Sequence, residues 1–135
     1  MDKKSKIFDC VILGGGPAGL SSALYCARAN LKSAIVDIST LGGTPFNYCE
    51  IENYLGFDKI EGDKLCEKFE NHIDNFDIEK FPFEEIEEVD LVSPIKKIKT
   101  LDREFLAKTV IIATGAKAKK LGVKGELEYI GKGVS

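Results

Sequence analysis

The sequence lacks most of the patterns that would point to metal binding, membrane insertion or nucleic-acid binding. Its single histidine, His72, has no second histidine or cysteine pair nearby, and its four cysteines show no C-x-x-C and no metal-ligand spacing. No apolar run approaches the roughly 18 residues of a membrane span, and no basic stripe is interleaved with aromatic residues. We therefore expect no metal site, no catalytic thiol pair, no membrane span and no nucleic-acid partner.

Length and composition favour one globular domain. The chain has 135 residues, 44% of them hydrophobic and 30% charged, with a formal net charge of −3 and no internal repeat. The early lysines resemble the start of a signal peptide, but Asp9 and the following glycines interrupt the apolar stretch that such a signal needs. We expect a cytoplasmic protein that can form one core but is short for a complete two-substrate redox enzyme.

One glycine-rich stretch organises the chain. Residues 10–20 read C-V-I-L-G-G-G-P-A-G-L, an apolar strand pattern that breaks into glycines and resumes with helical spacing. Gly14, Gly16 and Gly19 form G-x-G-x-x-G, which permits a tight turn, close approach of the backbone to a pyrophosphate, and close packing of helix on strand. The helix begins near Pro17, which needs no amide partner in a first turn, so free amides and the positive dipole end face an anion.

The residues around this stretch support a dinucleotide site. A second apolar run, residues 33–36, ends in Asp37, about 20 residues past the glycines, where the motif expects a carboxylate for ribose hydroxyls. The charge of Asp37 also disfavours a ligand with a 2′-phosphate. The alternative is a glycine-rich turn in an ordinary β-α-β unit that binds nothing. We expect dinucleotide binding.

The periodicity of apolar residues predicts an α/β fold. The expected elements are parallel strands at residues 7–13, 33–37 and 109–113, helices at 17–29 and 63–76, and an antiparallel meander near 85–107. We predict a Rossmann-like domain, with a parallel sheet, helices on both faces and an antiparallel β-meander excursion. Residues 1–121 would form this domain, and residues 122–135, which contain four glycines, would be a linker.

The remaining segments carry weaker signals. The loop at residues 39–62 is aromatic, so it either lies over a flat ligand or packs its rings on the domain. The acidic run at residues 84–90 and the later lysines are expected to be solvated faces without chemistry. Three cysteines are expected in the core, and Cys49 in the loop.

Several motifs resemble those of the low-molecular-weight thioredoxin reductases, and specifically the N-terminal part of their FAD-binding domain. They are G-G-G-P-A-G-L-S at 14–21, A-R-A-N-L at 27–31, I-E-N-Y-L-G-F at 51–57, A-T-G-A at 113–116 and Y-I-G-K-G-V-S at 129–135. The resemblance implies FAD, with its ADP half on the first β-α-β unit and the aromatic loop near the flavin. The expected cofactor-binding residues are Gly14, Gly16, Pro17, Ala18, Gly19, Asp37, Gly42, Gly43, Thr44, Asn53, Ala113, Thr114 and Gly115.

The resemblance also implies functions that lie outside this sequence. In the family, the position of Ser135 leads into a Cys-Ala-Thr-Cys dithiol within a nucleotide-binding domain. NADPH or another donor would act only through that absent domain, thioredoxin would be the partner of the complete enzyme, and a homodimer is a possible assembly. The chain alone is therefore expected not to be a competent reductase.

Two positions depart from the family pattern, and they keep alternatives open. Thr44 stands where the family usually has glutamine, and Leu55 stands where it usually has proline. Some ferredoxin-dependent flavin relatives are similar in having leucine there. The alternatives are a stand-alone dinucleotide-binding module without catalysis, and part of a ferredoxin-dependent flavin thioredoxin reductase.

Overall fold

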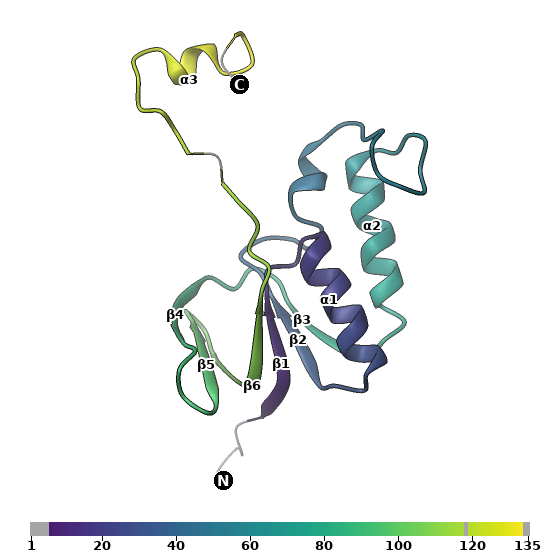
Figure 1. Ribbon diagram of the computed structural model, residues 1–135, viewed down its shortest axis with the longest axis vertical. Coiled ribbons are helices and arrows are strands. Elements are labelled where there is room, and N and C mark those ends of the chain that lie inside the picture. The colour runs from purple at the N-terminus through teal and green to yellow at the C-terminus, as the bar shows by residue number, and fades with distance from the viewer. Residues whose placement is uncertain (1–5, 118, 134–135) are drawn as a thin grey trace.

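The computed structural model describes residues 6–117 and 119–133, arranged around one six-stranded sheet in the order β3-β2-β1-β6-β5-β4 (Figure 1). The elements are β1 (Ile7–Leu13), α1 (Pro17–Arg28), β2 (Ser33–Val36), a 3-10 turn η1 (Thr44–Asn47), α2 (Gly62–Ile73), β3 (Ile78–Phe81), β4 (Ile86–Asp90), β5 (Lys96–Thr100), β6 (Glu104–Ile112) and α3 (Glu126–Tyr129). Residues 1–5 and 118 of the predicted domain, and residues 134–135 of the predicted linker, lie outside the described residues.

The centre of the sheet is parallel, as the sequence predicts. β1 pairs in parallel with β2, with Leu13 opposite Val36, and also with β6, with Leu13 opposite Ile112. The parallel strands are continuous apolar runs where they are buried on both faces, at Cys10–Leu13 of β1 and Ala34–Val36 of β2. Their carboxyl ends meet at one edge of the sheet, which is where ligands bind in open α/β sheets.

The last strand, β6, differs from the prediction of a meander followed by a separate strand. Its first half pairs antiparallel with β5, with Phe105 opposite Ile98, and its second half pairs in parallel with β1. Lys108 and Thr109 look like a polar break in the sequence but lie inside the strand, where both bind Asp9. The Lys108 ammonium lies 2.6 Å from the Asp9 carboxylate, and the Thr109 hydroxyl donates to the Asp9 carbonyl oxygen at 2.7 Å. One continuous strand therefore belongs to both halves of the sheet.

The strand β3 is not among the predicted elements. It pairs in parallel with β2 at the edge of the sheet, with Phe81 opposite Val36. Its middle residues, Glu79 and Lys80, are charged, so the segment lacks the apolar run by which a buried strand is found. Pairing with β2 decides its structure.

One face of the parallel sheet is covered by helices. Side chains of Cys10, Ile12 and Ile35 point to this face, where they pack with residues of α1 such as Leu20 and with Ile73 of α2. The helix α1 brings small residues to the contact, and Ala23 is fully buried. Both long helices lie on this side of the sheet (Figure 1).

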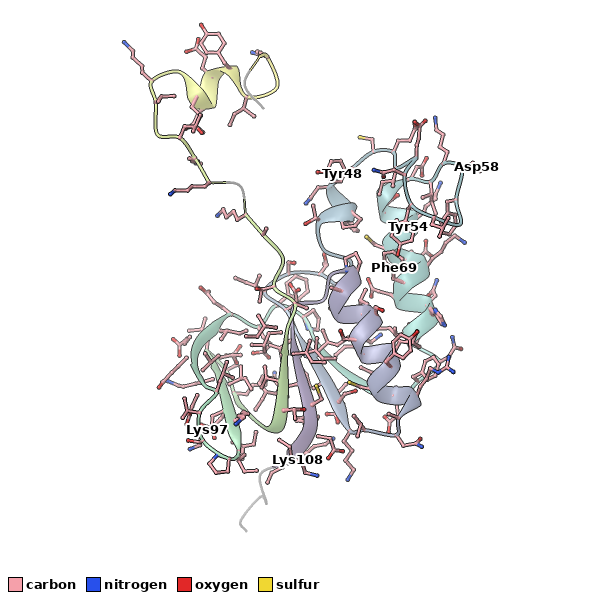
Figure 2. All side chains as sticks on the ribbon, in the orientation of Figure 1. Tyr48, Tyr54, Asp58, Phe69, Lys97 and Lys108 are labelled. Carbon is pink, nitrogen blue, oxygen red and sulfur yellow. The ribbon has the colours of Figure 1, made fainter. Side chains whose placement is uncertain are left out.

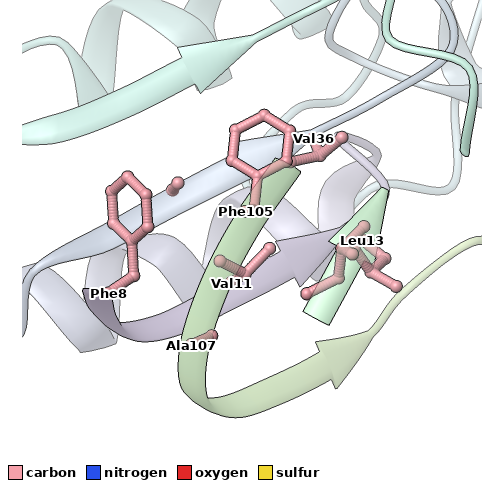
Figure 3. Close-up of a cluster of buried hydrophobic side chains, with 8 residues drawn as sticks. Phe8, Val11, Leu13, Val36, Phe105 and Ala107 are labelled. Atoms are coloured by element: carbon pink, nitrogen blue, oxygen red, sulfur yellow. The ribbon is translucent and has the colours of Figure 1, made fainter. Parts of the chain in front are cut away.

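The opposite face is covered by the meander, which departs from the expectation of helices on both faces. The alternate strand residues, among them Val11 and Val36, pack with Ile98 and Phe105 of the meander (Figure 3). The Phe105 ring lies edge-on to Phe81, with centroids 4.8 Å apart. A short antiparallel excursion thus buries the surface that a second helical layer would otherwise cover.

After β6 the chain leads away from the sheet towards α3 (Figure 1). The segment predicted as a linker holds this helix of four residues. The Glu126 carboxylate accepts hydrogen bonds from the amides of Leu121 and Gly122, at 2.8 and 2.7 Å. The division between domain and linker stays a prediction. None of the described helices combines the length and apolarity needed to cross a membrane.

Candidate dinucleotide site

A cleft of about 690 Å³ lies at the edge where the parallel strands end. Its walls come from the glycine loop after β1, the end of β2, the segment around η1, the loop before β4 and the residues after β6. Most of the predicted cofactor-binding residues line it, namely Gly14, Gly16, Pro17, Ala18, Asp37, Gly43, Thr44, Ala113, Thr114 and Gly115. The fold therefore brings these predicted residues together from four separate segments of the sequence.

The floor of the cleft is the tight turn at Gly14. This residue has φ 106°, a left-handed conformation that L side chains rarely adopt, and a Cβ there would lie 2.3 Å from the Ala113 carbonyl oxygen. The Gly14 amide donates to the Val36 carbonyl oxygen at 2.8 Å, and the Ala113 amide donates to the Leu13 carbonyl oxygen at 2.8 Å. The glycine lets the ends of three strands approach one another closely.

The amino end of α1 faces the cleft. Gly16 caps the helix without any side-chain hydrogen bond, and Pro17 follows as the first helical residue. Amides of a first helical turn have no partner within the helix, so they and the helix dipole favour an anion here. Gly43 closes over this loop, because a Cβ on it would lie 2.7 Å from the Gly16 Cα atom.

Asp37 lies at the carboxyl end of β2 and is already oriented by its neighbours. Its Oδ2 atom accepts a hydrogen bond from the Gly15 amide at 2.5 Å, and its Oδ1 atom accepts from the amide and hydroxyl of Ser39 at 2.7 and 2.9 Å. A carboxylate offers about four acceptor positions. One remains for a ligand hydroxyl, and the glycine loop holds the carboxylate beside the anion site.

Three predicted cofactor-binding residues lie outside the lining of this cleft. Gly19 serves packing, because a Cβ on it would lie 1.8 Å from the carbonyl oxygen of Gly14. Gly42 also serves packing, since its Cβ would lie 2.6 Å from the Cβ of Cys66 on α2. Asn53 lines a neighbouring pocket of about 740 Å³, which shares Thr44 with the cleft.

Sequence reasoning missed Glu84, which lines the cleft and is only 5% exposed. The prediction that the acidic run is a solvated face is wrong for this residue, although Glu85, Glu87 and Glu88 are exposed. No local signal distinguishes Glu84 from the other carboxylates of the run. The lysines of β5 fit the prediction better, since Lys97 is exposed near the meander's outer end (Figure 2).

The aromatic loop packs one of its rings on the domain, which is one of the two arrangements expected from its sequence. Tyr54 packs on α2, with its ring centroid 5.5 Å from that of Phe69 (Figure 2). Phe46 and Asn47 of the same loop, which are not among the predicted cofactor-binding residues, line the cleft instead. The loop is thereby ordered against α2 while its first turn contributes to the site.

Cys26 and Cys66 are poor candidates for redox chemistry. Cys10, Cys26 and Cys66 are buried, as predicted, and Cys49 in the loop is exposed. Burial, with Cys10 close by, raises the pKa of Cys26 to about 11, and burial also raises the pKa of Cys66. Thiols with raised pKa values are weak nucleophiles at neutral pH. Within residues 6–117 and 119–133, no three His, Cys, Asp or Glu side chains are grouped to hold a metal ion.

The hydrogen-bonding groups that line the cleft fit a dinucleotide. Backbone amides at the start of α1 suit a pyrophosphate, and the Asp37 carboxylate beside them suits a ribose hydroxyl. Glycines at 14 and 43 leave the backbone open where a Cβ would clash. Among the described lining residues none is a lysine or arginine, so an anion would depend on these amides.

Comparison with known proteins agrees with this geometry. A family model described as pyridine nucleotide-disulphide oxidoreductase matches residues 8–135. The chain is 41% identical to the thioredoxin reductase of Bacillus subtilis (strain 168) over 132 residues, which are 98% of this chain and 42% of that protein. It therefore spans less than half the length of this relative.

Solved structures give the same likeness. The crystal structure of T. acidophilum thioredoxin reductase matches with a TM-score of 0.82 and 41% identity, over 96% of this chain and 42% of that one. A ferredoxin-flavin thioredoxin reductase from Clostridium acetobutylicum matches with a TM-score of 0.73 and 34% identity, over 96% of this chain and 44% of that one.

Proposed function

The chain belongs to the pyridine nucleotide-disulphide oxidoreductase family, and on this premise we propose that it is the FAD-binding part of a thioredoxin-reductase-like flavoprotein. The observation that carries the proposal is the cleft, which joins the amino end of α1, Asp37 and the segment at residues 113–115 at the carboxyl edge of the parallel strands. This combination matches the chemistry of a pyrophosphate flanked by a ribose.

Each part of the cleft has a distinct role in this proposal. The first-turn amides of α1 hold the pyrophosphate, Asp37 accepts a hydrogen bond from the adenosine ribose, and the segment at 113–115 supports the cofactor. The turn at Gly43 and Thr44 leads towards the flavin side, where Asn53 lines the adjoining pocket. When bound, FAD would supply the redox chemistry, while the chain binds and orients it.

The activity that we propose belongs to a larger protein. Electrons would pass from a reduced nucleotide through FAD to a protein disulfide, with thioredoxin as the partner and NADPH acting through a domain beyond residues 122–135, which we propose as a linker. Likeness to thioredoxin reductases over nearly the whole chain supports this. We propose a cytoplasmic location, no membrane or nucleic-acid partner, and a homodimer as the assembly to test by analytical ultracentrifugation.

A different electron donor is the second candidate. The likeness to a ferredoxin-flavin thioredoxin reductase, at 34% identity over 96% of this chain, favours it. Stopped-flow reduction of the parent flavoprotein by NADPH and by reduced ferredoxin in parallel would distinguish the two donors.

FAD binding by the purified chain tests the proposal directly. We expect FAD to bind by equilibrium dialysis and ADP to compete with it. The same nucleotide carrying a 2′-phosphate should compete poorly, because the Asp37 carboxylate repels it. Absence of FAD binding, or equal competition by both nucleotides, would contradict the assignment of this cleft.

A reductase assay tests whether the chain is incomplete. With FAD, reduced nucleotide and thioredoxin supplied, we expect no turnover, because disulfide exchange needs an attacking thiolate and a nearby resolving thiol. Cys49 is the one exposed cysteine of the four. Robust turnover would refute this expectation, and loss of that turnover in Cys49→Ser would identify the thiol responsible.

A further inference from the structure

The buried carboxylate of Glu84 has no role in the function proposed above. Its side chain is 6% exposed, although it lies in a run of carboxylates and lines the cleft. Its Oε2 atom accepts a hydrogen bond from the Thr100 hydroxyl at 2.6 Å, and its Oε1 atom lies 2.6 Å from the Arg103 Nε atom. A buried carboxylate is costly unless it is paired and hydrogen-bonded, and both of its oxygens have partners here.

These partners belong to the turn between β5 and β6. The Thr100 amide donates to the Arg103 carbonyl oxygen at 2.9 Å, and the Arg103 amide donates to the Thr100 hydroxyl oxygen at 3.2 Å. The Arg103 guanidinium also lies over the Phe81 ring, 5.2 Å from its centroid. Glu84 thus binds a turn that is itself closed by hydrogen bonds and rests on the end of β3.

The backbone of Glu84 is joined to Asp37. The Glu84 amide donates to the Asp37 carbonyl oxygen at 2.8 Å, and the Asp37 amide donates to the Phe81 carbonyl oxygen at 3.1 Å. Between these two contacts Phe83 has φ 62°, a conformation that is strained for a bulky side chain and persists only where its surroundings fix it. The segment from Phe81 to Glu84 therefore holds the backbone that carries the Asp37 carboxylate.

We propose that Glu84 is a positioning residue for the ribose of the cofactor. By anchoring the β5–β6 turn and the backbone of Asp37 to one another, it fixes where the Asp37 carboxylate stands relative to the cleft. The inference rests on the proposed function, since it concerns how this cleft holds an adenosine ribose. The meander would then have a function in binding besides covering one face of the sheet.

The test measures how well the chain distinguishes a ribose with a 2′-hydroxyl from one without it. Equilibrium dialysis gives the dissociation constants of FAD, ADP and 2′-deoxy-ADP for the native chain and for Glu84→Gln, which keeps the side-chain volume. We expect the native chain to prefer ADP over 2′-deoxy-ADP by roughly tenfold, the effect of one hydrogen bond to a charged group. In Glu84→Gln this preference should fall to below about threefold.

Two further variants test a partner of Glu84 and a matched control. Thr100→Val keeps the buried shape but removes the hydroxyl that binds Glu84, so it should lower the preference to an intermediate value even if Glu84→Gln folds poorly. Glu87→Gln is the matched control, because Glu87 pairs with Lys99 at 3.4 Å through an exposed contact on the same meander. It should keep the native preference.

The outcomes separate the inference from the function on which it rests. Native preference in both Glu84→Gln and Thr100→Val would overturn the inference, as would equal weakening of ADP and 2′-deoxy-ADP, which is what a general loosening of the fold produces. FAD binding by a native chain that shows no preference for the 2′-hydroxyl would also overturn it. Failure of the native chain to bind FAD would overturn the proposed function and the inference together.

Discussion

Replacing Asp37 by alanine should weaken FAD binding about tenfold while the chain stays folded. The carboxylate accepts three hydrogen bonds from its own chain, from the Gly15 amide and from the amide and hydroxyl of Ser39. About one of its four acceptor positions is left for the ribose. One hydrogen bond to a charged group contributes about 1.5–3 kcal/mol, or roughly 10- to 150-fold in affinity. Because Asp37 is partly exposed, we expect the lower end.

The matched control is Asp9→Ala at the other end of the parallel strands. The Asp9 carboxylate also stabilises the fold, since it accepts hydrogen bonds from the Lys32 amide at 3.0 Å and the Lys108 ammonium at 2.6 Å. Lys108 lies near the amino end of β1 in Figure 2, away from the cleft. Both variants should therefore melt at lower temperature than the native chain, but only Asp37→Ala should lose FAD affinity.

Flavin fluorescence titration, with melting followed by circular dichroism, measures both effects on the same samples. Equal FAD affinity in the native chain and Asp37→Ala would refute the reasoning. An equal loss of affinity in Asp9→Ala and Asp37→Ala would refute it as well, because the effect would then follow stability and not the ribose contact.

Three further outcomes are expected. Gly16→Ala should melt like the native chain, because the added methyl meets only one protein atom, at 3.8 Å. It should still bind FAD more weakly in dialysis, because that methyl lies beside the cleft. Gly19→Ala should instead melt at lower temperature, because its methyl would lie 1.8 Å from a backbone oxygen. Ile35→Ala should cost about 2–5 kcal/mol in urea unfolding, since Ile35 is fully buried. Hydrogen bonds from Ser93 and the backbone lower the pKa of Asp90 from 3.8 to about 2. The contribution of this carboxylate to the free energy of unfolding is therefore complete above pH 3.8 and disappears as the pH falls through 2. In Asp90→Asn, the free energy of unfolding should depend less on pH over this range.

The parallel core and its glycine loop could be predicted from the sequence because local and tertiary requirements agree there. Residues 7–13 are apolar except for Asp9, and the strand forms over those residues. The first helix was expected at 17–29 and spans Pro17–Arg28. Gly14 and Gly19 carry their own signal, since a Cβ at either position would lie within 2.3 Å of a backbone oxygen.

The remainder depended on partners distant in sequence. β3 is a strand only because β2 lies beside it, and its charged residues give no apolar period. Glu84 is buried only because the turn containing Thr100 and Arg103 folds against it. Composition alone assigns such a carboxylate to a solvated run, and only the fold identifies it as part of the site.

The position of β6 has a consequence for the order of folding. This strand is the last of the sheet to be synthesised, yet it lies at the centre, and its Thr109 hydroxyl bonds to the backbone of Asp9, 100 residues earlier. Closing so long a loop delays the pairing of β1 with β6 until nearly the whole chain is available. A nascent chain can assemble β1, α1 and β2 beforehand, but its β1 edge stays open until β6 arrives. Pairing of β6 is therefore expected to limit the folding rate, and the open edge of β1 is the place where the unfinished chain is most prone to pair wrongly.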